Sequence, residues 1–411
     1  MKLDDAEREM LAGAAGPAAR WGIGYQRSVG KFFGAERMVS VRSAHIHCDG
    51  EALGEPGAAF LEDCVERGAR LAIPMTMDPR STDPERAREI GQDDSIVAEE
   101  ARIVGALTAM GAIPSNTCIN YQTLDVPHLG ERLAWGDTGT VIWANSVAGA
   151  RSNFEGGPAA LAAALTGRVA EYGFQLDEHR RGTVLVEISD QPRCLTDWGA
   201  LGALVGSAYP DYWEVPVLVG LERNPEPDEL KHLGAALASY GSQAMFHMVG
   251  VTPEARTVED AFGGEAPARR MSVPAGALAG VYESYLPERE APDLVVFGTP
   301  QLSLFEFRRI AEALEGRRVR PTVFLTTSAQ VRAGADDYGY TELVRAAGAV
   351  VLTGVCYYLM TARELARTRG FRTLLTDSAK LANTVQGYGY NPVLRPTDEC
   401  VEIAVRGRFG A

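Results

Sequence analysis

Short apolar runs, each bounded by turn residues and followed by a helical pattern, set the strongest limit on how this 411-residue chain can fold. The runs are Val184–Ile188, Val215–Val219, Leu294–Phe297, Thr322–Leu325 and Val350–Leu352. Continuous apolar runs of this length are typical of strands that are covered on both faces. Because they alternate with helical patterns, they predict an α/β fold with largely parallel sheets.

The first quarter of the chain has the same rhythm. Helices are expected at Asp4–Leu11, Ala18–Phe33, Ala58–Arg67 and Asp94–Met110, and strands at Arg37–Arg42 and Arg70–Pro74. A chain of this length exceeds the usual size of a single core, so two or more lobes are expected. Crossings between lobes could lie in the polar, Pro-rich segment 221–228 or in the loop-like segment 263–267.

A stretch rich in small and polar residues suggests an anion site. The run Thr140–Trp143 reads as a strand leading into Asn145 and Arg151, and Ala159–Leu165 reads as a helix that follows Gly156-Gly157. Free N–H groups at a helix start suit a carboxylate or phosphate, and an arginine can grip the same group bidentately. The alternative is a glycine-rich loop with a surface arginine.

Charge and composition exclude some classes of partner. The formal charge of −14 argues against nucleic acid and anionic membranes. No apolar run approaches membrane-spanning length, and the acidic start lacks the apolar core of a signal peptide. We therefore expect a cytoplasmic protein without nucleic-acid or membrane partners, whose six cysteines form no structural disulfides.

Polar and metal-competent side chains follow many of the expected strands. They are His45, His47, Thr76, Asp78, Asn145, Arg151, Thr299 and Cys356. In α/β sheets, ligands gather at the carboxyl ends of strands, so these residues are candidates for a site.

The cysteines divide into two groups. Cys64 lies in a helical pattern and Cys194 in a loop before a helix start, so both are expected to be structural. Cys118, Cys356 and Cys400 lie in polar surroundings after strands or just before the C-terminal helix. No CxxC pair exists, which disfavours a zinc ribbon. A three-cysteine metal site at 118, 356 and 400 remains one reading among several.

Several motifs, spread over nearly the whole chain, resemble the large subunit of the aconitase X family, a branch of the aconitase superfamily of hydro-lyases. They include Ser43-Ala44-His45-Ile46, Pro74-Met75-Thr76-Met77-Asp78, Thr117-Cys118, Trp143-Ala144-Asn145-Ser146, Glu155-Gly156-Gly157-Pro158, Thr376-Asp377-Ser378-Ala379-Lys380 and Asp398-Glu399-Cys400. The resemblance implies an aconitase-like α/β fold, with alternating helices and mostly parallel sheets in two or more lobes around a central cleft.

The resemblance also implies an iron-dependent dehydration. Cys118, Cys356 and Cys400 match the positions that hold either an iron–sulfur cluster, here expected to be of the 2Fe–2S type, or a single iron. Three protein ligands leave one position open for Lewis-acid chemistry on a hydroxyl group. The implied substrate is a small β-hydroxy carboxylate, such as cis-3-hydroxy-L-proline or mevalonate 5-phosphate.

Roles for the remaining residues follow from the same resemblance. The implied substrate-binding residues are Thr76, Asp78, Asn145, Arg151, Gly156 and Gly157. Lys380 is expected to stabilise negative charge, Ser378 to position the substrate, and His45 to be the reserve candidate for a base. A small swivel-domain subunit is expected as a separate partner that supplies a serine base, because the chain ends at Ala411 soon after Cys400.

Three positions depart from the family pattern, which usually shows Thr-Asp-Thr-Cys, Pro-His and Thr-Leu-Asn where this chain has Gly354, Gln301 and Asp78. They suggest an altered substrate, as in a hydroxy-acid dehydratase or isomerase of a specialised pathway. Two readings of other classes stay open, a non-catalytic iron–sulfur scaffold subunit and a zinc protein.

Overall fold

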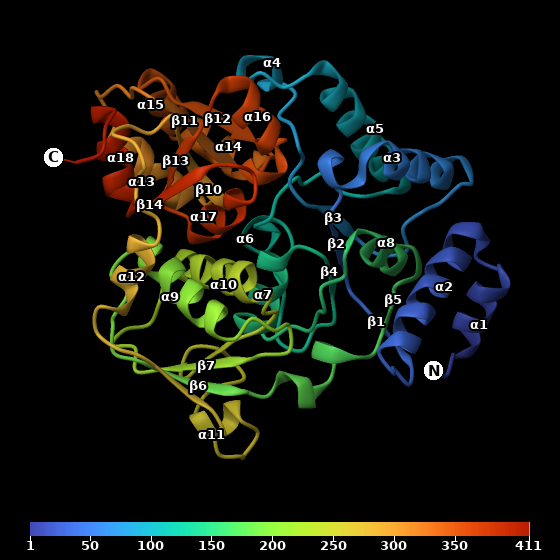
Figure 1. The fold of residues 1–411 in the computed structure, drawn as a ribbon. Coiled ribbons are helices and arrows are strands. Elements are labelled where there is room, and N and C mark those ends of the chain that lie inside the picture. The colour runs from blue at the N-terminus through green and yellow to red at the C-terminus, as the bar shows by residue number, and fades with distance from the viewer. Residues whose placement is uncertain (411) are drawn as a thin grey trace.

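The computed structural model describes residues 1–410. Its elements form three layered units, which meet near the centre of the molecule around α6 (Asn120–Thr123) and α7 (Thr138–Ser146) (Figure 1). The N-terminal unit lies on the right in that view, the C-terminal unit at the upper left, and the middle unit below them. Three sheets are entirely parallel, and one two-stranded sheet is antiparallel.

The N-terminal unit is built on a parallel sheet with the order β3-β2-β4. Its strands are β1 (Met38–Ser40), β2 (Ala44–Ile46), β3 (Met75–Met77), β4 (Ala134–Trp135) and β5 (Arg168–Ala170). Its helices, besides α6 and α7, are α1 (Asp5–Ala12), α2 (Gly16–Phe32), α3 (Gly50–Glu66), α4 (Ala87–Ile90), α5 (Asp94–Met110) and α8 (Gly157–Thr166). Strands β2 and β3 are buried on both faces, so the polar residues His45 and Thr76 need partners inside the protein.

The middle unit has a parallel sheet with the order β8-β7-β6-β9. Its strands are β6 (Val184–Ile188), β7 (Pro216–Val219), β8 (His247–Met248) and β9 (Arg270–Val273), and its helices are α9 (Leu195–Ala208), α10 (Pro227–Gly241), α11 (Val258–Ala261) and α12 (Ala277–Glu283). Helices α9 and α10 approach each other closely because Gly202 has no side chain; a Cβ there would lie 2.5 Å from the carbonyl oxygen of Leu233.

The C-terminal unit has a five-stranded parallel sheet with the order β12-β11-β10-β13-β14. Its strands are β10 (Leu294–Leu302), β11 (Thr322–Thr327), β12 (Val350–Thr353), β13 (Thr373–Thr376) and β14 (Asn391–Leu394). Its helices are α13 (Leu304–Leu314), α14 (Ala329–Asp337), α15 (Tyr340–Ala346), α16 (Ala362–Arg369), α17 (Ala379–Gln386) and α18 (Thr397–Arg406). Apolar clusters lie on both faces of this sheet, as expected for continuous apolar strands.

The α/β prediction is confirmed, and two local predictions are wrong. Residues 140–143 lie in α7, capped by Asp137, and almost every residue of this helix is buried. A helix that is buried all round loses its amphipathic period and reads as a strand. The strand expected at 70–74 begins only at Met75. Both expected crossings lie within the middle unit: residues 221–226 connect β7 to α10, whose first residues are 227–228, and residues 263–267 lie between α11 and β9.

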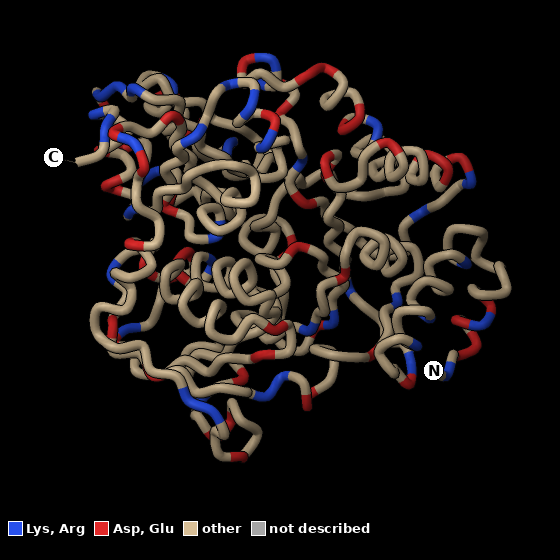
Figure 2. Tube along the Cα trace, viewed as in Figure 1, with Lys and Arg blue, Asp and Glu red and all other residues tan. Residues whose placement is uncertain are grey.

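Acidic and basic residues alternate over the outer elements of the molecule (Figure 2). None of the helices in residues 1–410 combines the length and the apolar character that crossing a bilayer requires.

Candidate active site

Two of the three candidate metal-ligating cysteines lie together where the N-terminal and C-terminal units meet. Cys118 precedes α6, and Cys356 follows β12; both are buried. The neighbouring Cys356 thiol has the largest effect on the pKa of the Cys118 thiol, and burial has the second largest; both raise it. The hydroxyl of Thr299, in β10, lies 3.5 Å from the Cys356 sulfur. The fold brings these two thiols together although they are 238 positions apart in the chain.

Gln301 joins the two loops that carry these cysteines. Its backbone N–H donates to the Cys118 sulfur at 3.4 Å. Its side-chain amide donates to the carbonyl oxygens of Asn116, at 3.2 Å, and Val355, at 3.0 Å. This side chain, flagged in the sequence only as a departure from the family pattern, therefore holds both loops in place.

A buried network of charged residues holds the backbone of Gln301 in place. Lys231 of α10 donates to the Gln301 carbonyl oxygen at 3.2 Å and forms an ion pair with Glu306. His232 hydrogen-bonds the same carboxylate at 2.8 Å. Burial alone would raise the pKa of Glu306, but Lys231 and His232 lower it to about 2. The carboxylate is therefore ionised at neutral pH and anchors the end of β10.

Asp78, just after β3, lies between two histidines. His45 approaches one carboxylate oxygen at 3.4 Å, and His47 hydrogen-bonds the other at 2.6 Å. Burial would lower the pKa of His47, yet the bond to Asp78 and the charges of Asp78, Asp49 and Asp137 raise it to about 9. The His47 side chain is 30% exposed, whereas His45 is fully buried. His47 is therefore the histidine that can reach a substrate.

Lys380 supplies the buried positive charge of the site. It lies in the first turn of α17, is 5% exposed, and places its ammonium 3.9 Å from an Asp137 carboxylate oxygen and 5.6 Å from the centre of the Tyr358 ring. Burial lowers the pKa of Lys380. The negative charges around it raise that pKa; they belong to Asp137, the two thiols and Asp78. Lys380, Asp137, Asp78 and the thiols thus share one electrostatic neighbourhood.

The start of α8 lies beside this neighbourhood. A Cβ added to Gly157 would lie 2.8 Å from the carbonyl oxygen of His47, so only glycine fits this contact. Gly136 is packed in the same way against the carbonyl oxygens of Glu155 and His45. Gly156 and Gly157 therefore place the N-terminus of α8 against the backbone of His47.

Asn145 and Arg151 join a different network. Asn145 lies roughly 12 Å along α7 from Asp137 at 1.5 Å per residue, and its amide bonds Ser152 and the Ala244 carbonyl oxygen. Arg151 donates to the Gln175 carbonyl oxygen and forms an ion pair with Asp177. The structure does not bring either side chain to the cysteine pair.

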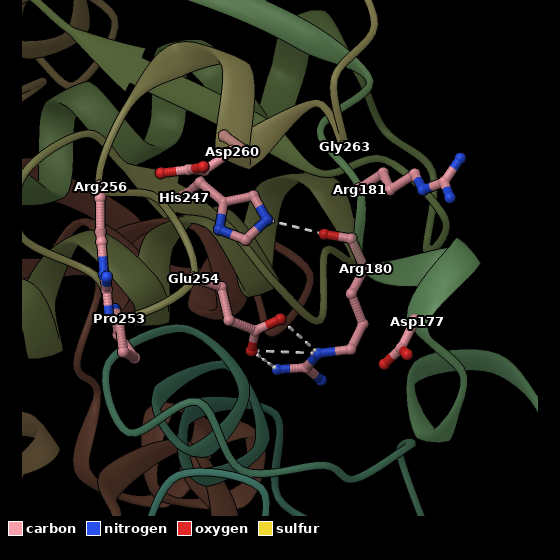
Figure 3. A pocket seen from close by; sticks show the side chains of 10 residues that line it. Asp177, Arg180, Arg181, His247, Pro253, Glu254, Arg256, Asp260 and Gly263 are labelled. Carbon is pink, nitrogen blue, oxygen red and sulfur yellow. Dashed lines mark hydrogen bonds and ion pairs between the residues drawn. The ribbon is translucent and has the colours of Figure 1, made fainter.

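The buried residue Arg180 organises that network. It donates to the Asn145 carbonyl oxygen at 3.0 Å and to the Glu254 carboxylate at 2.9 Å. Arg180 and Glu254 line a pocket of about 450 Å³ together with His247 (Figure 3). Asn145, through the Ala244 carbonyl oxygen, therefore links the N-terminal and middle units, whereas Arg151 bonds residues that follow β5.

Three further predicted residues have structural partners. Cys400 lies inside α18, not before it, and its thiol contacts the Arg395 carbonyl oxygen at 3.3 Å in the core of the C-terminal unit. The Ser378 hydroxyl caps α17 and bonds the Thr299 carbonyl oxygen. The Thr76 hydroxyl contacts His45 at 2.8 Å. Ser378 and Thr76 thus act as positioning residues, and the structure does not bring Cys400 to the other two cysteines.

From the sequence, His47 was one of the candidate residues that follow strands but received no role, and Asp137 was not a candidate. His47 follows His45 by two positions at the end of a strand, so both point to the same side. That spacing was a usable signal. Asp137 went unnoticed because residues 140–143 were read as a strand, which hid the helix that Asp137 caps.

Glu155, directly before the Gly156-Gly157 turn, gives a prediction on stability. Burial raises its pKa to about 7, against a hydrogen bond from Gln26 that lowers it. A carboxyl with a raised folded-state pKa contributes stability that is full below its unfolded pKa and is lost as pH rises towards 7. Glu155→Gln stays neutral, so we expect it to be more stable than the wild type by about 2–3 kcal/mol at pH 8, with little difference at pH 4.5.

Thermal melting of both proteins over this pH range checks the prediction. Glu288→Gln is the matched control, because Glu288 is exposed. An equal difference between Glu155→Gln and wild type at both pH values would contradict the assignment.

The residues present fit a thiophilic metal in part. The observation is the donor set itself: two buried thiols in contact, one of which accepts a backbone N–H, with a hydroxyl beside the other. Thiolates are preferred ligands of iron–sulfur centres. Within residues 1–410, no group of three or more His, Cys, Asp or Glu side chains is arranged to hold a metal ion. The pair is thus a two-thiol donor set with an adjacent oxygen.

Comparisons with known proteins agree with this picture. Models of the aconitase X first, second and third domains match residues 1–178, 182–283 and 292–406. The phosphomevalonate dehydratase large subunit of Methanothermobacter thermautotrophicus is 36% identical over 94% of both chains. The cis-3-hydroxy-L-proline dehydratase of Pseudomonas aeruginosa is 35% identical over the whole of this chain and 71% of that protein.

A solved structure supports the same relationship. The crystal structure of Thermococcus kodakaraensis aconitase X in its holo-form has a TM-score of 0.88 and 30% identity, covering 98% of this chain and all of that one. Sequence and fold agree from end to end with relatives that are dehydratases, and the chain belongs to the aconitase X family.

Proposed function

We propose that this chain is the large subunit of a hydro-lyase that removes water from a small β-hydroxy carboxylate. The observation that carries the proposal is the meeting of Cys118 and Cys356 with Lys380 and the His47–Asp78 pair at the junction of two units. Dehydration needs electrophilic help for the leaving hydroxyl, a cation for developing negative charge, and a group that moves a proton. This arrangement offers residues for all three tasks.

The metal proposal rests on the two thiols. Cys118 and Cys356 would hold an iron–sulfur cluster of the 2Fe–2S type, or a single iron, with Thr299 as the neighbouring oxygen donor. Such a centre supplies Lewis acidity towards a substrate hydroxyl. Cys400, the third candidate of the sequence, would have to leave its contact with Arg395 to take part.

The protein's own residues bind and orient the substrate. The N–H groups at the start of α8 bind the carboxylate. The Lys380 ammonium stabilises negative charge that develops on substrate oxygens. His47, held by Asp78, carries a proton at neutral pH and can donate it to the departing hydroxide. His45 and Ser378 keep these groups in position.

Two substrates lead the proposal because relatives bear their names: cis-3-hydroxy-L-proline and mevalonate 5-phosphate. We also propose a small swivel-domain subunit as partner, supported by the name "large subunit" of several relatives. That subunit would supply the base and cover the site, so the large chain alone would be inactive.

Co-expression with a small subunit, anaerobic purification and a screen of β-hydroxy acids for water loss test the proposal. Metal analysis and the visible spectrum distinguish iron–sulfur, mononuclear iron and zinc. Iron without turnover of any tested acid would favour the scaffold alternative. Equal turnover by the large subunit alone would place the base within this chain.

The pKa of His47 can be measured directly. Because the elevation to about 9 depends on Asp78, Asp78→Asn should move it towards the ordinary value of about 6.5. NMR titration of the histidine ring protons checks this shift. The control is Asp177→Asn, which removes an exposed carboxylate bonded to Arg151. An unchanged His47 titration in Asp78→Asn would remove the pair from the proposal.

A further inference from the structure

Arg80 lies beside the cysteine pair and has no anionic partner. Its backbone N–H donates to the Gly354 carbonyl oxygen at 2.8 Å, and its guanidinium makes one hydrogen bond, to the Thr353 carbonyl oxygen at 3.3 Å. The Nε–H is shielded from solvent and has no acceptor. Among residues 1–410, Arg80 forms no ion pair, although the site around it is rich in carboxylates.

The guanidinium lies between the loops that carry Cys118 and Cys356. A Cβ at Gly354 would lie 3.0 Å from an Arg80 terminal nitrogen and 3.1 Å from the Asn116 Cβ. Gly354 has a φ of +72°, a conformation in which few side chains are tolerated. The absence of a side chain at 354 therefore lets the backbone approach the guanidinium without a side chain crowding it.

The nearby Asp83 carboxylate already accepts hydrogen bonds from two backbone N–H groups. Asp83 accepts the backbone N–H of Thr353 at 2.8 Å with one oxygen and that of Glu85 at 3.0 Å with the other. A buried charged donor without an acceptor is costly, so the Nε–H of Arg80 calls for a partner, which a ligand can supply. A planar guanidinium fits an oxyanion group best.

We infer that Arg80 binds a second oxyanion group of the substrate, a phosphate or a second carboxylate, distinct from the carboxylate at the start of α8. The inference deepens the proposed function and rests on it for the identity of the ligand as substrate. Arg80 then selects doubly anionic hydroxy acids over singly charged ones. The oxyanion itself can be tested without turnover.

The experiment titrates the purified full-length chain with inorganic phosphate and, separately, with acetate. Calorimetry reports the affinity, and the Arg80 Nε–H resonance reports the place. Arg80→Gln should weaken binding by about 10- to 100-fold, the effect of losing a charge-assisted hydrogen bond. Arg86→Gln is the control, because Arg86 lies in the same unit and pairs with Glu89 at the surface.

Two substitutions at position 354 separate the effect of a negative charge from the effect of side-chain size. Asp and Asn have the same size and both tolerate positive φ better than most residues. Both variants should weaken anion binding, because any side chain at 354 crowds the guanidinium, and Gly354→Asp, which also pairs with its charge, should weaken it more than Gly354→Asn. Comparison of these two isosteres removes the common effect of backbone strain, and melting curves confirm that both fold.

The outcomes are distinct. Phosphate binding that Arg80→Gln removes supports a phosphorylated substrate, and acetate binding removed in the same way supports a second carboxylate. Binding of neither anion, or equal binding by Arg80→Gln and wild type, overturns the inference. Neither result depends on dehydration, so failure of the proposed function would be seen separately, as iron-loaded complex without turnover.

Discussion

Cys118→Ser and Cys356→Ser should each lose the bound metal, while Cys400→Ser keeps it. The two thiols of the pair are neighbours, whereas Cys400 contacts a backbone carbonyl oxygen inside the C-terminal core. Loss of an outer partner of a metal ligand already weakens binding about 10- to 100-fold, so loss of a thiolate should exceed that range.

Iron content and the visible spectrum after anaerobic purification measure the effect. Cys64→Ser is an additional control, since Cys64 packs in the core of the N-terminal unit. Full metal loss in Cys400→Ser, with an unchanged melting temperature, would return that cysteine to the ligand set and show that the loaded state differs from the arrangement described above. Retention in Cys118→Ser or Cys356→Ser would end the metal assignment.

Lys380→Met should lower kcat of the active complex by about 10²- to 10³-fold, the range seen when one preorganised charge-stabilising donor is removed. The ammonium is buried beside Asp137 and close to both thiols, so water replaces it poorly. Because the charge is needed most when negative charge develops, kcat should fall more than KM rises.

Lys31→Met is a suitable control, because Lys31 is exposed on α2. Removing Lys380 also leaves Asp137 without its cation, so the melting temperature and the metal content must be measured on the same samples. An unchanged kcat with intact metal would assign Lys380 to the support of Asp137 alone.

The elements that the sequence predicted well have clear local signals. Helix α5 has the predicted bounds, with Asp93 as its cap and Gly111 in the left-handed conformation after its end. Strand β6 also has the predicted bounds, because it is short, mostly apolar and buried at every residue except Glu187. Helix α7 was wrongly predicted to be a strand, because a helix that is buried all round lacks the apolar period by which helices are recognised in a sequence.

Prediction of the site was limited by the same physics. Cys118 and Cys356 could be grouped through the family pattern. Nothing in the sequence around Cys400 indicates that its thiol lies in a buried helix, away from the other two cysteines. Asn145 and Arg151 looked functional because polar residues in a glycine-rich loop often bind ligands. In the structure their polar groups bond the backbone, which is how buried polar residues are usually satisfied.

The position of the cysteine pair has a mechanical consequence. Cys118 belongs to the first segment of the family and Cys356 to the third, so a centre bound to both would act as a removable cross-link between two separately folded sheets. Without it, hydrogen bonds join these segments: those of the Gln301 amide, that of the Arg80 backbone with Gly354 and that of Thr353 with Asp83. A centre bound to both thiols would thus reinforce, by metal–thiolate bonds, a joint that is otherwise held by hydrogen bonds and packing.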